Sequence, residues 1–140
     1  MKTLARVTLF TLALLTPAVM RAQGRTPEQL ASALVDAMRA NDEAAINALQ
    51  HPSMHNCATL NDPKYVARLR QVRESSRPKI NGPYKVRLFA VSDSMNAPIA
   101  YETVRPTQQL DISFDGTDFS LLRRIAQSGN DWFIVMPCFR

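Results

Sequence analysis

The spacing of hydrophobic residues changes once along this chain, close to Pro83. Before that point, apolar residues such as Leu30, Leu34 and Met38 recur at helical intervals. After it, apolar and polar residues alternate, which is typical of strands with one buried face. Helices that precede strands in this way favour the α+β class. We therefore expect N-terminal helices packed on a curved, antiparallel, four-stranded sheet.

Three helices are predicted before the change in spacing. Residues 26–29 form a capping box around a proline, which marks the start of the first helix. Asn41 or Asp42 caps a shorter second helix, which ends before Pro52 because a residue that precedes proline disfavours helix. The third helix begins at Asp62. Its single apolar face is made of Tyr65, Val66, Leu69 and Val72.

Alternating runs then predict the strands. They lie at residues 84–90, 99–104, 110–114, 119–126 and 132–136. Asp115 and Gly116 predict a tight hairpin between two of them. Both faces of the last run are apolar, so we expect this strand to be packed on both sides.

The N-terminus has the order of a cleavable signal peptide. Basic residues precede an apolar run of about nine residues, and a proline and small residues follow it. The run is too short for a membrane-spanning helix, which needs roughly twenty apolar residues. The small residues allow cleavage after Ala18, Ala22 or Gly24. We expect residues 1–24 to be removed on export to the periplasm or the medium, leaving no stable membrane anchor, and residues 25–140 to form one domain.

This leader holds much of the positive charge. The full chain has 17 basic and 12 acidic residues. Lys2, Arg6 and Arg21 lie in the leader, so the exported chain keeps 14 basic residues (17 − 3) against 12 acidic ones, a net charge of about +2. The small charge and the exported location both argue against a nucleic-acid partner.

Cys57 and Cys138 are the only cysteines of the chain. Because disulfides persist in exported proteins, a bridge between the two is the simplest interpretation. It would close a loop of roughly 80 residues and, in the chain-entropy account, stabilise the fold by at most about 4 to 5 kcal/mol. The alternative is two buried free thiols.

The order of these elements resembles the nuclear-transport-factor-like superfamily. The resemblance lies in the helix corner at residues 41–43, the helix exit at 49–52 and the closing strand at 129–135. It implies a cone-shaped fold, in which a curved sheet wraps around a long helix and encloses a pocket. It also implies frequent dimerisation through the outer face of the sheet. A cystatin-like fold is the structural alternative, and three leading helices count against it.

No sequence motif assigns a catalytic residue. A general acid or base in the pocket would have to be Tyr65, Tyr101, Asp111 or His55, because only these have suitable chemistry at positions that can face inward. The chain does not reproduce the tyrosine and two aspartates of the isomerases in this superfamily. Asp111 alternates with apolar neighbours and is most simply a solvent-facing strand residue.

The leading hypothesis is an exported domain that binds a small ligand or another protein. The pocket is expected between the first helix and one face of the sheet, lined by Leu34, Tyr65, Val86, Leu88, Tyr101, Ile112 and Ile134. The alternative is a cofactor-free isomerase or dehydratase-like enzyme. Neither hypothesis includes a cofactor.

A third hypothesis is metal handling by the segment after the second helix. His51, Met54, His55 and Cys57 place soft ligands for copper or zinc within seven residues. The hypothesis weakens if Cys57 is in a disulfide, because only a thiolate binds metal well. His51 and His55 would then be the two remaining ligands, and we expect no metal site.

Two surfaces suggest partners. Arg70, Arg73 and Arg77 lie on one side of the third helix and predict a basic surface for an anionic partner, or simply a solvated face. Trp132 and Phe133 point to opposite faces of the last strand. If both faces of the sheet are apolar, the one away from the helices predicts a homodimer.

Overall fold

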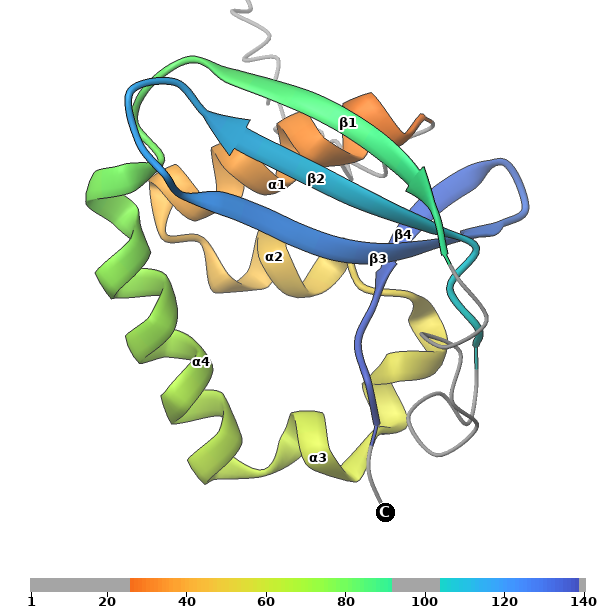
Figure 1. The fold of residues 1–140 in the computed structure, drawn as a ribbon. Coiled ribbons are helices and arrows are strands. Elements are labelled where there is room, and N and C mark those ends of the chain that lie inside the picture. The colour runs from red at the N-terminus through yellow and green to blue at the C-terminus, as the bar shows by residue number, and fades with distance from the viewer. Residues whose placement is uncertain (1–25, 92–103, 139–140) are drawn as a thin grey trace, which may run out of the picture.

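The computed structural model describes residues 26–91 and 104–138 (Figure 1). Its helical elements are α1 (Pro27–Ala40), α2 (Glu43–Ala48), the 3-10 helix η1 (Pro52–Asn56), α3 (Ala58–Asn61), α4 (Pro63–Ser76) and the 3-10 helix η2 (Arg77–Lys79). Its strands are β1 (Tyr84–Ala90), β2 (Gln108–Phe114), β3 (Ser120–Ser128) and β4 (Asp131–Val135). The predicted leader, Tyr101 and nearly all of the predicted strand 99–104 lie outside the described residues.

The helices begin where the sequence predicts. The Thr26 hydroxyl accepts a hydrogen bond from the Gln29 backbone N–H at 3.2 Å, and the Gln29 side chain accepts one from the Thr26 N–H at 3.1 Å. This confirms the capping box. Asn41 ends α1 in the left-handed conformation (φ 54°), and Asp42 caps α2 by accepting from the Ala45 N–H at 2.9 Å. Asn41 therefore ends α1, and Asp42 starts α2.

The third predicted helix is α4, and its start is also confirmed. The Asp62 carboxylate accepts hydrogen bonds from the backbone N–H groups of Lys64 at 2.7 Å and Tyr65 at 3.3 Å. Two short helices between α2 and α4, η1 and α3, are additional to the prediction. The His51 ring nitrogen caps η1 by accepting from the Ser53 N–H at 3.2 Å, which explains how a loop-like sequence forms a turn of helix.

The strands form one antiparallel sheet in the order β1-β2-β3-β4. Asp115 and Gly116 lie in the turn between β2 and β3, where Gly116 has a φ of 77° that favours glycine. The predicted hairpin is therefore confirmed. Helices followed by a four-stranded antiparallel sheet confirm the α+β class.

The main core lies between α1 and one face of this sheet. Figure 1 shows α1 and α2 against that face, while α4 extends away from the sheet. The fully buried side chains of this main core include Leu30, Leu34, Val35, Leu110, Ile112 and Ile125. Ile80, from the crossing between the helices and β1, is buried in the same cluster. The Arg39 guanidinium of α1 fixes this crossing by donating to the carbonyls of Ile80 at 2.8 Å and Gly82 at 2.6 Å.

Strand β4 is packed on both faces, as its sequence predicts. Ile134, 3% exposed, belongs to the main core. Val135 lies on the opposite face in a second cluster with Met54 of η1 and Ala126 of β3. The Phe133 ring lies on this second face too, 5.6 Å from the His51 ring. The apolar second face of β4 is thus covered by the chain itself, and the homodimer stays a prediction.

The segment that leaves α2 also pairs with β4. The Ile134 N–H donates to the Leu49 carbonyl at 2.8 Å, and the His51 N–H donates to the Ile134 carbonyl at 2.9 Å. These bonds form an isolated parallel bridge between Gln50 and Ile134. They hold the helical segment on one edge of the sheet.

The disulfide between Cys57 and Cys138 is present. The two Cα atoms are 5.8 Å apart, and both side chains are buried. The bridge joins the residue that precedes α3 to the chain just after β4. The alternative of two free thiols is therefore wrong, and Cys57 has no thiolate for a metal.

Replacement of both cysteines by serine should lower the free energy of unfolding substantially. The bridge spans a sequence separation of 81 residues. For such a loop the chain-entropy account sets an upper limit of about 4.5 kcal/mol, and we expect a loss of about 3 to 4 kcal/mol. Urea unfolding of the oxidised protein and the double variant measures it. A loss below about 1 kcal/mol would contradict this role, and the double variant should not respond to a reductant.

Candidate functional site

Helix α4 carries an apolar stripe that is not packed into either core. Val66 and Leu69 are partly exposed, and Val72 is 54% exposed. Of all fourteen residues in α4, only Ser76 is buried. An apolar stripe normally faces a core, so its exposure here needs an explanation.

The stripe forms one wall of a cavity of about 480 Å³. Leu69 and Val72 of α4 face residues from α1, α2, β3 and the chain around the end of β4. The other apolar lining residues include Leu34, Met38, Ile46, Ile134, Met136 and Pro137. Polar lining residues include Asn47, Gln50 and Gln109, together with Arg73, Arg123 and Arg124. Among the described residues that line the cavity there is no aspartate or glutamate.

The expected pocket residues divide into four groups. Leu34 and Ile134 line the cavity. Ile112 is fully buried and Val86 packs against the core, so both contribute to stability rather than to the cavity wall. Leu88 is 38% exposed. Tyr65 lies on α4 outside the lining, and Tyr101 lies outside the described residues.

The cavity lies further along the sheet than the sequence suggests, because α1 packs directly on β1 and β2. Side chains of α1 pack in the same core cluster as Val86 and Ile112, where the sequence predicts a ligand. The open volume lies instead beside β3 and β4. This shift depends on where α4 stands relative to the sheet, and no periodicity in the sequence reports that position.

Arg123 is the candidate site residue that sequence reasoning missed. Its register partner in β2 is Leu110, so its side chain shares the inner face of the sheet with those of Leu121 and Ile125, which are buried. An arginine between two core positions of one strand was the available signal. Such a position is costly for a cation unless a partner or a ligand is near.

The surroundings of Arg123 provide no carboxylate. Its Nη1 donates to the Leu122 carbonyl at 2.8 Å, and no described residue forms an ion pair with it. Burial lowers the pKa of the Arg123 guanidinium, and the nearby Tyr65 phenol acts in the opposite direction. Arg123 is therefore a partly buried positive charge on the cavity wall.

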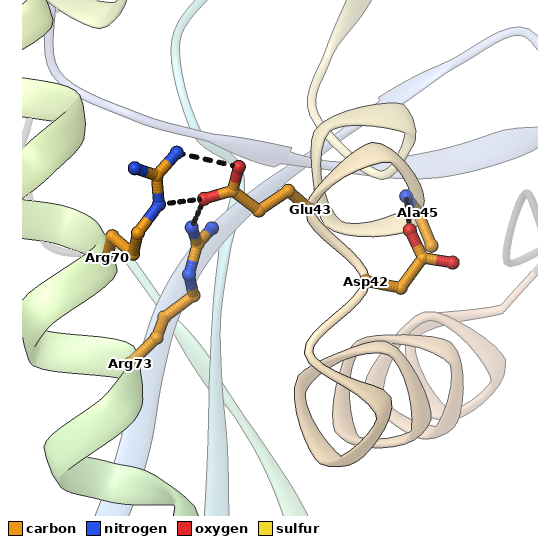
Figure 2. Close-up of polar contacts among 5 residues, drawn as sticks. All are labelled: Asp42, Glu43, Ala45, Arg70 and Arg73. Carbon is orange, nitrogen blue, oxygen red and sulfur yellow. Dashed lines mark hydrogen bonds and ion pairs between the residues drawn. The ribbon is translucent and has the colours of Figure 1, made fainter.

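One carboxylate, that of Glu43, neutralises part of the predicted basic surface. Figure 2 shows Arg70 and Arg73 of α4 converging on Glu43 at the start of α2. Arg70 binds both carboxylate oxygens, with Nε to Oε1 at 2.9 Å and Nη2 to Oε2 at 3.0 Å, and Arg73 also binds Oε1 through Nη2. Arg77 lies exposed at the end of α4. No pattern in the sequence indicates that Glu43 lies opposite these arginines.

These contacts shift the pKa values of both Glu43 and Arg70. Hydrogen bonding from Arg70, with the positive charges of Arg70 and Arg73, lowers the pKa of Glu43, and burial opposes them. The same bond to Glu43 raises the pKa of Arg70. The Nε of Arg73, in contrast, is buried and has no hydrogen-bond partner among the described residues. Other atoms of Arg73 line the cavity.

The expectation that Asp111 faces solvent is wrong. Asp111 is 5% exposed and pairs with Arg87, whose Nη2 lies 2.7 Å from Oδ2. It sits on an inner strand between Arg87 of β1 and Leu122 of β3, and these long side chains shield it. Its side chain points to the sheet face opposite Leu110 and Ile112, so it does not line the cavity.

In the segment proposed for metal binding, His51 and Cys57 make structural contacts. His51 Nδ1 lies 2.7 Å from the Ser53 hydroxyl, and burial lowers the pKa of His51. His55 is exposed on η1, and Cys57 is in the disulfide. Within residues 26–91 and 104–138, no group of three or more His, Cys, Asp or Glu side chains is placed to hold a metal ion.

Fold and site together define an α+β protein with an apolar cavity and an uncompensated cation in its wall. No family model, curated protein or solved structure matches the chain. Across the described ranges, no helix is both long and apolar enough to cross a membrane.

Replacement of Glu43 by glutamine should remove a pH-dependent part of the stability. The pKa of Glu43 is lower in the folded protein than in the unfolded chain, so its contribution is fully present above the ordinary carboxyl pKa of about 4.3. That contribution is lost as the pH falls through the folded pKa. The difference in melting temperature between wild type and Glu43→Gln should therefore shrink from pH 7 to pH 3. The exposed Asp118→Asn is the control, and a pH-independent difference for Glu43→Gln would contradict the ion pair.

Proposed function

We propose that this chain is an exported domain that binds a small apolar ligand in the cavity between α4 and the sheet. The observation that carries the proposal is the apolar stripe of α4, which lines a cavity instead of a core. A volume of about 480 Å³ falls within the range of about 300 to 1,000 Å³ typical of small-molecule sites. Most of the lining is apolar, and a few polar groups can orient a ligand.

The energetics favour a ligand over an empty cavity. Apolar surface removed from water contributes about 25 cal/mol per Å². Val72 and Leu69 forgo much of this contribution in the free protein, and a ligand between α4 and β3 would recover it. An exposed apolar stripe is otherwise a liability, because it invites association with unrelated proteins.

The wall formed by α4 is fixed from outside the cavity. Glu43 joins it to α2 through Arg70 and Arg73, and the disulfide restrains the segment that leads into it. Restraints of this kind support a preformed site, which lowers the ordering cost of binding. They are also compatible with the cone-shaped fold of the nuclear-transport-factor-like superfamily, which we propose as the architecture.

Export is the second part of the proposal. Residues 1–24 have the order of a signal peptide, and the Cys57–Cys138 bridge suits an oxidising compartment. The periplasm or the medium would then be where the ligand is met. The proposal includes neither a cofactor nor a catalytic residue.

Expression of the full chain in a bacterium should yield an exported product that begins at Val19, Gln23 or Arg25. Intact-mass measurement of the periplasmic fraction identifies the start, and thiol labelling should modify no cysteine before reduction and two after it. Leu12→Arg, which interrupts the apolar run, should keep the chain in the cytoplasm at full length. Recovery of wild type only as the full-length cytoplasmic chain would overturn export.

Binding of the neutral fluorescent probe N-phenyl-1-naphthylamine should depend on the cavity. Val72→Trp fills the space beside α4, so we expect a loss of probe affinity of about tenfold or more. Gln71→Trp places the same side chain on an exposed, non-lining position of α4 and should bind as wild type does. Fluorescence titration measures both. Equal affinity of the two variants would place the probe elsewhere and contradict the proposed site.

A further inference from the structure

The polar groups of the cavity wall are unbalanced in charge. Arg73, Arg123 and Arg124 line the cavity, and no described lining residue carries a negative charge. Arg73 shares Glu43, which lies outside the lining, with Arg70. Arg123 forms no ion pair with a carboxylate among the described residues, so the wall carries an excess of positive charge.

The arginines of the cavity wall also have hydrogen-bond donors that lack acceptors among the described residues. Arg123 uses Nη1 on a neighbouring backbone carbonyl, which leaves the rest of its fork without a partner among the described residues. The Nε of Arg73 is a buried donor without a partner among the described residues. Buried donors without acceptors destabilise a protein. The remaining donors of Arg123 are not buried, so an acceptor from outside the described chain can reach them.

We propose that the ligand is an amphiphilic monocarboxylate, with its hydrocarbon body against α4 and its carboxylate on Arg123. This rests on the proposed function and specifies the ligand class. The planar guanidinium fork matches the two oxygens of a carboxylate. Most of the lining is apolar, which suits a ligand with a single charged end.

The test compares decanoate with 1-decanol as competitors of N-phenyl-1-naphthylamine at pH 8. The two share a ten-carbon chain and differ in charge. Because a hydrogen bond between two charged groups is stronger than one to a hydroxyl, wild type should prefer decanoate by about tenfold or more. Arg123→Gln should reduce the preference to less than about twofold and leave decanol affinity unchanged. The exposed Arg77→Gln is the matched control and should keep the full preference.

Each outcome decides a separate point. If the probe binds but wild type displaces it equally with decanoate and decanol, the carboxylate assignment fails and the apolar site stands. If the probe does not bind at all, both proposals fail. If Arg123→Gln does not fold, Arg123→Lys keeps the charge but loses the fork and should retain an intermediate preference. A preference that survives intact in a folded Arg123→Gln would assign the carboxylate to another residue and overturn the role of Arg123.

Discussion

The burial of β4 on both faces is the constraint on which the rest of this structure depends. Ile134 closes the main core on one face, and Val135 closes the second cluster with Met54 on the other. Because the chain that leaves α2 bonds to Ile134, the helical half is attached to the sheet at the same strand. A five-residue strand therefore connects α1, η1 and the sheet. Substitutions in β4 would disturb two clusters at once, whereas those in β1 would disturb one edge.

Local signals in the sequence are sufficient to predict much of the fold. The Thr26 capping box, the Asp62 cap and the Asp115–Gly116 turn each act within a few residues, and each is present as predicted. Four of the five alternating runs in the sequence, all except 99–104, correspond to antiparallel strands in hairpin order. Short-range chemistry is readable because its partners are neighbours in sequence. The α+β class follows from the order of such local elements.

The candidate site was predicted less well, because it depends on contacts between distant segments. Val86 and Ile112 were assigned to a pocket that α1 in fact fills, and Asp111 was placed in solvent although Arg87 and Leu122 shield it. Arg70 and Arg73 read as a free basic surface until Glu43, some 30 residues earlier, is seen opposite them. Periodicity tells which face a residue lies on. It does not tell what lies against that face.

The Cys57–Cys138 bridge affects the stage at which the cavity is completed. Met136 and Pro137 border the cavity and lie between the end of β4 and the bridged Cys138. In a reducing compartment this short segment would be held only by β4, so one border of the cavity would lack its restraint. Oxidation would then complete the binding site as well as stabilise the fold. A chain still in transit would accordingly be a poor receptor, and ligand capture would begin only at its destination.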